Sequence, residues 1–447
     1  MEFKEMYLID CVNDIIDYRG KTPKKLKDNW SEDGDYRAIS AKNIKNMNLV
    51  NQNSMNKAKA SLYKKWMKKE IDKGDILLTS EAPLGETLYW DFEEKIILSQ
   101  RVFGLKANNE IVNSKYLFAY MQTPFFKHEL FARESGTTVT GIRRKELEKV
   151  IIKVPSMYIQ SYIGQIIYNI NYKINNNNKI IANLEELSQT LFKRWFVDFE
   201  FPDEDGNPYK SSGGEMVESE LGDIPEGWEI QKINQIVNFI NGHAFKSKEL
   251  YKYNKNKKMY HVFKMGHIKQ GGGLKSDATK SFYPKGIEKK LEKFVLKKGD
   301  ILMSMTDMKN KVAILGNTAL MNRDDKYIVN QRVGLLRLKE DTYIDYPFLY
   351  ILTNSNEFLT TLRKKANSGV QVNLTSKAIK EQLVIVPSKN YHNKFNMITK
   401  PIYLKIFDLE IENEYLTILR DTLLPKLMSG ELEIPDDIEV NTDELSI

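Results

Sequence analysis

Two stretches of the chain carry apolar residues at alternating spacings of three and four, the pattern of an amphipathic helix with a narrow apolar stripe. The first stretch contains Ile163, Ile166, Ile170, Lys173, Asn177, Ile180, Leu184, Leu187 and Leu191. The second contains Ile402, Ile406, Leu409, Leu416, Leu419, Leu423 and Leu427. Each stretch predicts a helix of about 40 residues, which would be about 60 Å long.

A stripe this narrow is typical of a helix that packs against another helix, so we predict that the two long helices pair as a coiled coil. The polar residues Lys173 and Asn177 on the stripe would set the register of the pair. Leu187→Asp is therefore expected to break the pairing. The alternative is two unrelated helices, each packed on its own domain. The residues expected to hold the pair are Leu184, Leu187, Leu191, Leu416, Leu419 and Leu423.

Each long helix follows a region in which short apolar runs alternate with helical periodicity. Residues 75–79, 95–98 and 150–154 have the pattern of strands, and residues 114–132 have the pattern of a helix. Residues 228–387 repeat this plan, with 345–364 as the matching helix.

Short sequence phrases recur in the same order, about 225 to 233 residues apart. A repeat this long indicates a duplicated domain, because solenoid units are usually about 20 to 50 residues. The residues between the phrases differ, which suggests two similar modules that read two different things. The phrases are Ile44-Lys45 and Ile268-Lys269, Lys73–Leu77 and Lys298–Leu302, Gln100–Val102 and Gln331–Val333, Ser135-Gly136 and Ser368-Gly369, and Val154–Ser156 and Val386–Ser388.

These patterns divide the chain into six segments. Two similar mixed α/β domains occupy residues 1–155 and 228–387, and two long helices occupy 156–198 and 388–430. An acidic linker rich in proline and glycine covers 199–227, and an acidic tail covers 431–447. Because the linker lets the chain return, the helices can lie antiparallel with a globular domain at each end. We expect an α+β dumbbell with pseudo-twofold symmetry.

The net charge of +7 conceals a strong segregation of charge. Residues 198–226 hold ten acids and one base, and the tail holds seven acids and no base. The remainder has 66 basic and 43 acidic residues, an excess of the kind that a polyanion such as nucleic acid attracts. The alternative is a lysine-rich surface that reflects an AT-rich genome.

Several classes of protein are disfavoured by the composition. No run approaches the roughly 18 apolar residues of a membrane span, and residues 1–5 lack the layout of a signal peptide. The one cysteine, Cys11, allows no intrachain disulfide. These features favour a cytoplasmic protein with no membrane partner.

No catalytic or metal-binding motif is complete. Gly20-Lys21-Thr22 lacks the earlier glycine of a phosphate-binding loop. The spacing of His243, His261 and His267 matches no common zinc pattern. We therefore expect no catalytic residue, no metal site and no cofactor in this chain.

Candidate DNA contacts lie at three pairs of corresponding places in the two copies. Gln, Asn and Arg can hydrogen-bond base edges, whereas Lys, Ser and Thr suit phosphates. The alternatives are that Gln-Arg is a conformational anchor and that the Ser-Gly segments are turns. The candidates are Lys42, Asn43, Lys45, Arg101, Ser135, Thr137, Thr138, Arg143, Arg144 and Lys145 in the first copy, and His267, Lys269, Arg332, Ser368, Gln371, Asn373 and Lys377 in the second.

Three segments resemble a known family. Leu191–Phe199, Leu221–Glu229 and Leu423–Glu431 are similar to shared segments of the specificity subunit of type I restriction–modification systems. The Lys-Gly-Asp-Ile-Leu and Ser-Gly phrases resemble landmarks of that family's target recognition domains. The resemblance covers nearly the whole chain.

The resemblance implies that each domain reads one half of a bipartite, asymmetric double-stranded DNA site, with the long helices fixing the gap. Two methyltransferase subunits would use S-adenosylmethionine to methylate adenine, and two restriction–translocase subunits would use ATP and Mg²⁺. All cofactors would then belong to partner subunits. The open alternatives are a related system that cuts beside its site, a stand-alone DNA-binding regulator and a coiled-coil scaffold.

Overall fold

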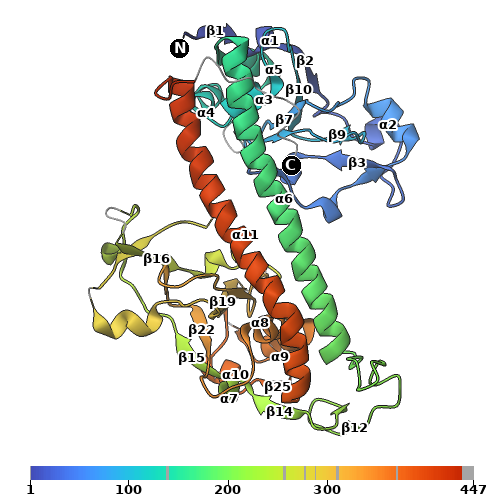
Figure 1. Cartoon of the computed structure of the whole chain (residues 1–447). Helices are drawn as coiled ribbons and strands as arrows, with labels where there is room; N and C mark the ends of the chain where they lie inside the picture. The colour runs from blue at the N-terminus through green and yellow to red at the C-terminus, as the bar shows by residue number, and fades with distance from the viewer. Residues whose placement is uncertain are drawn as a thin grey trace. The chain divides into compact units, whose positions relative to one another are not determined.

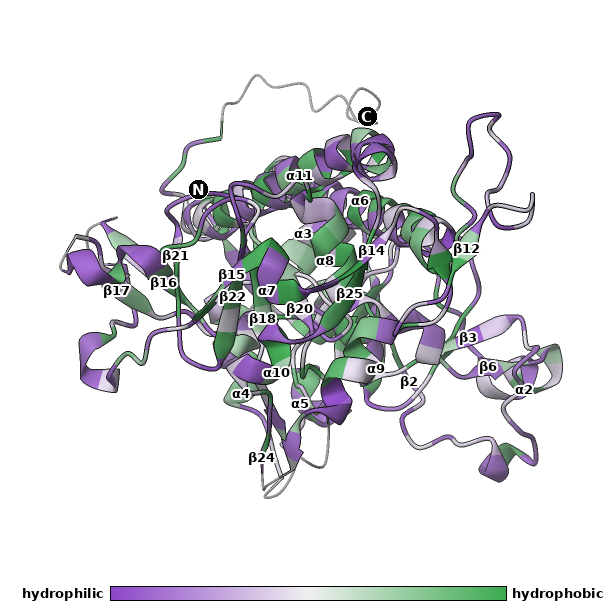
Figure 2. Ribbon diagram, turned by 90° about the horizontal axis from the view of Figure 1, so that it is seen from below, coloured by the Kyte–Doolittle hydropathy of each residue, from purple (hydrophilic) through white to green (hydrophobic). Residues whose placement is uncertain are grey.

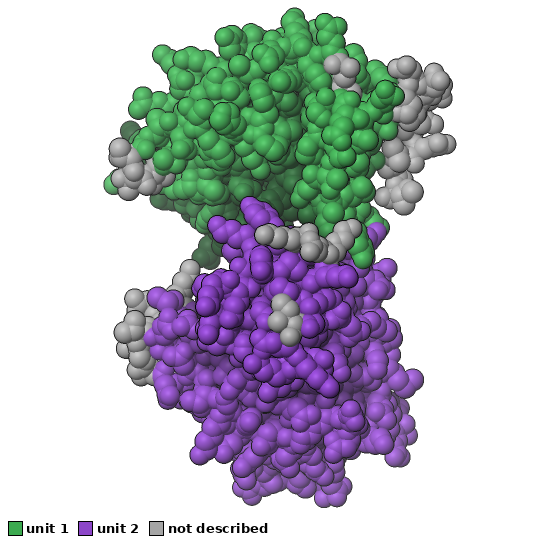
Figure 3. All heavy atoms as spheres, turned by 90° about the vertical axis from the view of Figure 1, so that its left-hand side faces the viewer, with its two compact units in different colours: residues 1–176, 415–447 green, residues 177–414 purple. Residues whose placement is uncertain are grey.

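The computed structural model describes residues 2–136, 140–254, 258–275, 278–286, 288–308, 312–368 and 371–434 (Figure 1). The chain forms two compact units (Figure 3). Unit 1 comprises Met1–Asn176 and Tyr415–Ile447, and unit 2 comprises Asn177–Glu414. Each unit therefore contains one globular domain and a part of both long helices.

The globular domain of unit 1 is built on a four-stranded antiparallel sheet in the order β2-β10-β7-β8. A smaller sheet has the order β6-β3-β9, and β1 pairs with β11. The strands are β1 (Lys4–Tyr7), β2 (Val12–Asp17), β3 (Tyr36–Ile39), β4 (Ile44–Lys45), β5 (Asn48–Leu49), β6 (Lys57–Ala58), β7 (Ile76–Thr79), β8 (Thr87–Tyr89), β9 (Ile97–Leu98), β10 (Val102–Ala107) and β11 (Ile151–Val154). The short helices are α1 (Leu8–Cys11), α2 (Ala60–Trp66), α3 (Ser114–Tyr120), α4 (Pro124–Phe131) and α5 (Arg144–Leu147).

The globular domain of unit 2 repeats this topology. Its main sheet has the order β15-β22-β18-β20, its second sheet is β17-β16-β21, and β14 pairs with β25. The strands are β14 (Glu229–Lys232), β15 (Val237–Asn241), β16 (Met259–Phe263), β17 (Phe282–Pro284), β18 (Ile301–Ser304), β19 (Thr306–Met308), β20 (Thr318–Leu320), β21 (Tyr327–Val329), β22 (Val333–Leu338), β23 (Asn367–Ser368), β24 (Gln371–Asn373) and β25 (Leu383–Val386). The helices are α7 (Ile233–Ile236), α8 (Tyr346–Asn354), α9 (Asn356–Lys364) and α10 (Ser376–Lys380). The prediction of two similar α+β domains is confirmed.

Apolar residues line the buried strands of these sheets. Strand β18 and strand β20 are buried along their whole length, and both are coloured as hydrophobic in Figure 2. Strands that are buried along their whole length are expected where both faces of a sheet are covered.

The two long helices are α6 (Met157–Phe196) and α11 (Lys389–Ser429). Both begin just after a Val-Pro-Ser phrase, where proline disfavours helix in the preceding residue. In unit 2, Phe192 and Phe196 near the end of α6 lie against Phe395 near the start of α11, which makes the helices antiparallel. None of the described helices is long and apolar enough to cross a membrane.

The buried seam of α6 differs from the predicted stripe in one of its two columns. The column of Ile163, Ile170, Asn177, Leu184 and Leu191 is buried or half-buried, as predicted. The second column consists of Ile167, Ile174, Ile181 and Ser188, not of Ile166, Lys173, Ile180 and Leu187. Ile181 is 8% exposed, whereas Ile180 is 44% and Leu187 is 55% exposed.

The prediction that Leu187 and Leu419 hold the helix pair is therefore wrong. Leu187 is 55% and Leu419 is 47% exposed. Leu184 and Leu191 pack on the core of unit 2, Leu423 packs on that of unit 1, and Leu416 is half-buried. Leu187→Asp is therefore no longer expected to break the helix pairing.

Polar residues punctuate the seam at one level in unit 2. Asn177 is buried and donates its side-chain amide to Glu412 Oε2 (2.8 Å) and Asn413 Oδ1 (3.0 Å). A buried polar group with specific partners penalises other alignments of two helices, so Asn177 suits the predicted register role. Lys173 is exposed and lies outside the buried columns of α6.

Each globular domain is tied to a long helix by polar contacts from one equivalent loop. In unit 1, Tyr168 of α6 donates a hydrogen bond to Asp91, which follows β8. In unit 2, Asn322, which follows β20, donates to Glu410 Oε2 of α11 at 2.8 Å, and Arg323 pairs with Glu414 at 2.7 Å. Burial raises the pKa of Glu410 to about 7.

The linker after α6 is anchored by aromatic side chains. Phe201 is fully buried and stacks on Trp228, with ring centroids 5.0 Å apart. Phe196 and Phe199 also contact Trp228. The family-like segments Leu191–Phe199 and Leu221–Glu229 thus contribute to the core of unit 2. The linker also carries the short strands β12 (Met216–Val217) and β13 (Ile224–Pro225).

Candidate nucleic-acid interface

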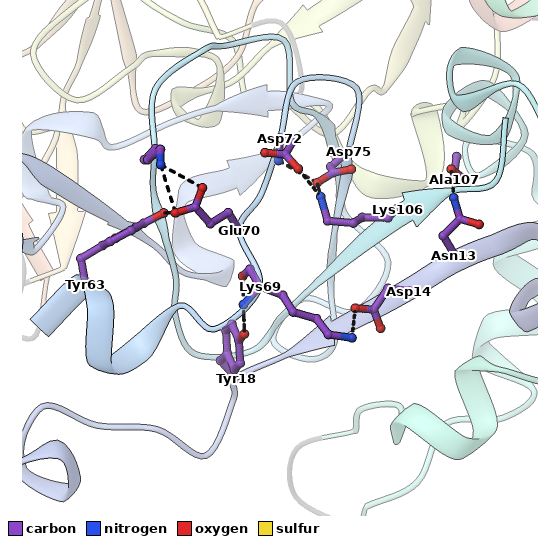
Figure 4. Close-up of polar contacts among 11 residues, drawn as sticks. Asn13, Asp14, Tyr18, Tyr63, Lys69, Glu70, Asp72, Asp75, Lys106 and Ala107 are labelled. Carbon is purple, nitrogen blue, oxygen red and sulfur yellow. Dashed lines mark hydrogen bonds and ion pairs between the residues drawn. The ribbon is translucent and has the colours of Figure 1, made fainter.

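The repeated Lys-Gly-Asp-Ile-Leu phrase builds the frame that carries the candidate contacts. Gly74 and Gly299 both have positive φ, at 96° and 87°, a conformation that glycine adopts without strain. The aspartate after this glycine forms an ion pair with a basic residue of the central strand: Asp75 with Lys106 at 2.7 Å (Figure 4), and Asp300 with Arg337 at 2.6 Å. The phrase is therefore structural in both units.

The Gln-Arg phrase forms the same turn in both units. Arg101 and Arg332 each precede a central strand, β10 or β22, and each has positive φ, at 64° and 70°. The carbonyl of Arg101 accepts a hydrogen bond from Ser80 N (2.8 Å), and that of Arg332 accepts one from Met305 N (3.0 Å). Both arginines are exposed. The turn therefore presents an arginine beside the segment that follows the third strand of each sheet.

The Ser-Gly phrase leads back to this segment. In unit 1, Ser135 pairs with Gly141, and Ile142 N donates to Ser80 O at 2.9 Å. In unit 2, Leu374 N donates to Met305 O at 2.8 Å. Two of the three predicted clusters therefore lie side by side in each unit, joined through Ser80 or Met305.

The side chains around the two turns differ. In unit 2, β24 pairs with β19, and Thr306 Oγ1 donates to Asn373 Oδ1 at 2.9 Å. Gln371 is half-buried, and Asn373 and Lys377 are exposed. Ser368 ends β23. This surface offers amides and one ammonium.

In unit 1, Arg143 and Lys145 are exposed at the start of α5, and Arg144 pairs with Glu148 at 2.9 Å. Ser135 is also exposed. The predicted contacts Thr137 and Thr138 lie outside the described residues. The unit 1 surface is thus more basic than its counterpart.

Arg19 lies at this surface of unit 1 but is not among the contacts predicted from the sequence. Its Nη1 donates to Ile142 O (3.0 Å), it pairs with Asp17 at 2.8 Å, and its guanidinium lies 4.0 Å from the centre of the Phe103 ring. Arg19 directly precedes Gly20-Lys21-Thr22, the segment that was compared with a phosphate-binding loop. The phosphate-loop pattern does not specify the residue before its second glycine, so the comparison did not single out Arg19.

The third predicted cluster is largely structural, and two of its assignments are wrong. Asn43 is fully buried and accepts hydrogen bonds from Ser40 N (3.1 Å) and Ser40 Oγ (2.9 Å). His267 is 2% exposed, and its Nδ1 lies 3.1 Å from Lys264 N in the same relative position. Both side chains complete a tight turn and are too buried to make the predicted contacts.

The lysines of this cluster are exposed but differ in surroundings. Lys42 Nζ lies 3.4 Å from Ser54 O, and Lys45 is exposed at the β4–β5 hairpin. Burial raises the pKa of Glu185 and of Glu410 in the long helices, and the charge of Lys269 opposes that rise. The surroundings of Lys269 therefore favour a role at the domain–helix junction.

The described residues contain no group of three or more His, Cys, Asp and Glu side chains able to hold a metal. The nearest approach is a buried pair, His261 and His267, whose Nε2 atoms are 3.3 Å apart. Burial lowers the pKa of His261 to about 3 and that of His267 to about 4, so both are neutral at pH 7. The exposed side chains at the two Gln-Arg turns are suited to binding a partner molecule.

Comparison with known proteins agrees with this picture. The family model "Type I restriction modification DNA specificity domain" matches residues 9–186 and 225–413. The specificity subunit of the type I restriction enzyme MjaIX of Methanocaldococcus jannaschii is 25% identical over 427 residues, which cover 93% of this chain and 91% of the relative. The HindI specificity subunit of Haemophilus influenzae is 24% identical over 424 residues, covering 82% and 88%.

The fold has a solved counterpart. The S subunit of a type I restriction–modification system from M. genitalium superposes with a TM-score of 0.58 at 18% identity, covering 95% of this chain and 96% of that chain. At this identity the likeness concerns the fold. The family match, in contrast, spans both repeats with their Gln-Arg turns and most of the long helices. The chain therefore belongs to the family of type I restriction–modification DNA specificity subunits.

Proposed function

We propose that each unit reads one half of a bipartite, asymmetric DNA site for a type I restriction–modification complex. The observation that carries the proposal is the paired surface at the Gln-Arg turns, equivalent in backbone but different in side chains. Unit 1 offers Ser135 and Arg143 there, whereas unit 2 offers Gln371 and Asn373. Different hydrogen-bonding groups on one scaffold suit two different half-sites.

The long helices would fix the gap between the half-sites. Helices α6 and α11 each run without interruption across the boundary between the units. Asn177 supplies a polar register point in their seam. A continuous helix pair is a suitable spacer because it limits the separations at which two readers can dock.

The chain would direct catalysis by partner subunits. Two methyltransferase subunits with S-adenosylmethionine would modify adenine, and two restriction–translocase subunits with ATP and Mg²⁺ would move and cut DNA. Exposed apolar side chains on the helices of unit 2, among them Ile180, Leu187 and Met397, support docking of a methyltransferase subunit there. Leu187, which was predicted to hold the helix pair, is thus part of the candidate partner surface.

Equilibrium DNA binding tests the proposal directly. The chain, assembled with methyltransferase subunits from the same system, is titrated with duplex DNA between 50 and 200 mM salt. A reader that neutralises several phosphates loses affinity by roughly a thousandfold or more over that range. Weak binding that salt does not change would favour the scaffold alternative, and tight site-specific binding by the chain alone would favour the regulator.

A further inference from the structure

The two Gln-Arg turns combine features that a purely structural arginine does not need. Of the nine non-glycine residues with positive φ among those described, only Arg101 and Arg332 occupy equivalent places in the two repeats. The left-handed region is sparsely populated by side chains other than glycine and asparagine. Both copies nevertheless carry arginine at this position.

The backbone alone performs the structural work of the turn. In unit 1 the carbonyl of Gln100 accepts from Ala41 N at 3.2 Å, and the carbonyl of Arg101 accepts from Ser80 N at 2.8 Å. Glycine would make the same backbone contacts without strain. A conformational anchor therefore explains the turn but gives no reason for a guanidinium on it.

The arginine side chains point outward. The Arg101 side chain is 48% exposed, with its Nε 3.4 Å from Glu81 Oε1. Arg332 is also exposed, and within the part of the chain that the structure describes its guanidinium has no ion-pair partner. Both guanidinium groups can therefore bind an anion from outside the chain.

We propose that Arg101 and Arg332 bind the DNA phosphate backbone, one in each half-site, and so set the position of each reader. This inference rests on the proposed function. A residue shared by two readers whose other side chains differ suits the feature that the two half-sites share, which is the phosphate backbone. The residues that differ, such as Arg143 and Gln371, are left to contact bases.

The surroundings predict unequal contributions. Glu81 competes with phosphate for the Arg101 guanidinium. At the equivalent place unit 2 has Thr306, which is uncharged and buried. Removal of Arg332 should therefore weaken DNA binding more than removal of Arg101.

Glycine substitution separates the two roles of the turn. Arg101→Gly and Arg332→Gly remove the guanidinium and also relieve the left-handed strain, so the melting temperature should stay the same or rise. Arg332→Gly, in the full chain assembled with its methyltransferase subunits, should lower the salt slope of DNA binding by about 0.9 and lower affinity roughly tenfold at 0.1 M salt, and Arg101→Gly should lower both by less. The methylated sequence should be unchanged.

Two further variants serve as controls. Lys27→Gly also removes a positive charge from a left-handed residue (φ 53°) of unit 1, and its salt slope should equal that of the wild type. Arg332→Lys should keep most of the slope, because a phosphate contact needs a charge whereas a bidentate base contact needs the guanidinium fork.

The outcomes separate this inference from the proposed function. Salt-dependent binding by the wild type with an unchanged slope in both glycine variants would overturn the phosphate assignment alone. A relaxed methylation motif at one half-site would also overturn it, in favour of base reading. Absence of salt-dependent binding by the wild-type complex would overturn the proposed function together with the inference.

Discussion

The corrected helix seam is tested most sharply by two neighbouring isoleucines of α6. Ile181 is 8% exposed and belongs to the core of unit 2, whereas Ile180 is 44% exposed. Truncating a buried isoleucine to alanine costs about 2–5 kcal/mol, because it loses the transfer free energy and leaves a cavity. Truncating an exposed one usually changes stability by less than about 0.5 kcal/mol. The gain in helix propensity on going from isoleucine to alanine is the same at both positions and cancels in the comparison.

The expected shift is large enough to measure by calorimetry. For domains of about 150–250 residues, 1 kcal/mol moves the melting temperature by roughly 2–4 °C. A loss of about 3 kcal/mol in Ile181→Ala should therefore lower the transition of unit 2 by roughly 6–12 °C. Ile180→Ala, the matched control, should melt within about 2 °C of the wild type. Equal losses, or a larger loss for Ile180→Ala, would refute the assignment of the seam.

Three further variants test the packing and electrostatics of the two units. Arg337→Met leaves the Asp300 carboxylate buried without its ion pair, and the free energy of unfolding from urea denaturation should fall by about 3–5 kcal/mol; an unchanged midpoint would show that the pair is dispensable. Burial lowers the pKa of His267 to about 4, below its unfolded value of about 6.5, so the unfolded chain binds the proton first and stability falls as pH drops from about 6.5 to 4. His267→Gln should remove up to about 1.4 kcal/mol per pH unit from that decline, and an identical pH profile would contradict the assignment. Gly164→Ala should lower the melting temperature of unit 1 despite alanine's better helix propensity, because a Cβ there would lie 2.6 Å from the backbone of α3; Gly20→Ala, with open space around it, is the control, and a gain in stability for Gly164→Ala would refute the argument.

The repeat and its strands could be predicted because each recurring phrase is short and its residue types indicate a specific local structure. Lys-Gly-Asp marks a glycine-dependent turn followed by a buried aspartate, and the same elements follow in both copies. The buried edge of α6 could not be predicted in the same way. Isoleucine occupies both candidate columns, at 180 and 181, and the column that is buried depends on where the globular domain and the other helix pack.

The candidate interface was predictable in place but not in every residue. The Gln-Arg and Ser-Gly phrases do meet in each unit. Asn43 and His267 recur for a structural reason, since each completes a tight turn, and recurrence in two copies cannot separate a fold requirement from a binding requirement. The left-handed backbone of Arg101 and Arg332 was invisible in the sequence because arginine gives no sign of positive φ.

The most direct test of the central claim is base-resolution mapping of adenine methylation in a host that expresses the methyltransferase subunit of the same system, with and without this chain. The account predicts a methylated motif in two different halves separated by a fixed gap, present only when this chain is present. Absence of any methylation that depends on this chain, with a methyltransferase shown to work with another specificity subunit, would contradict it.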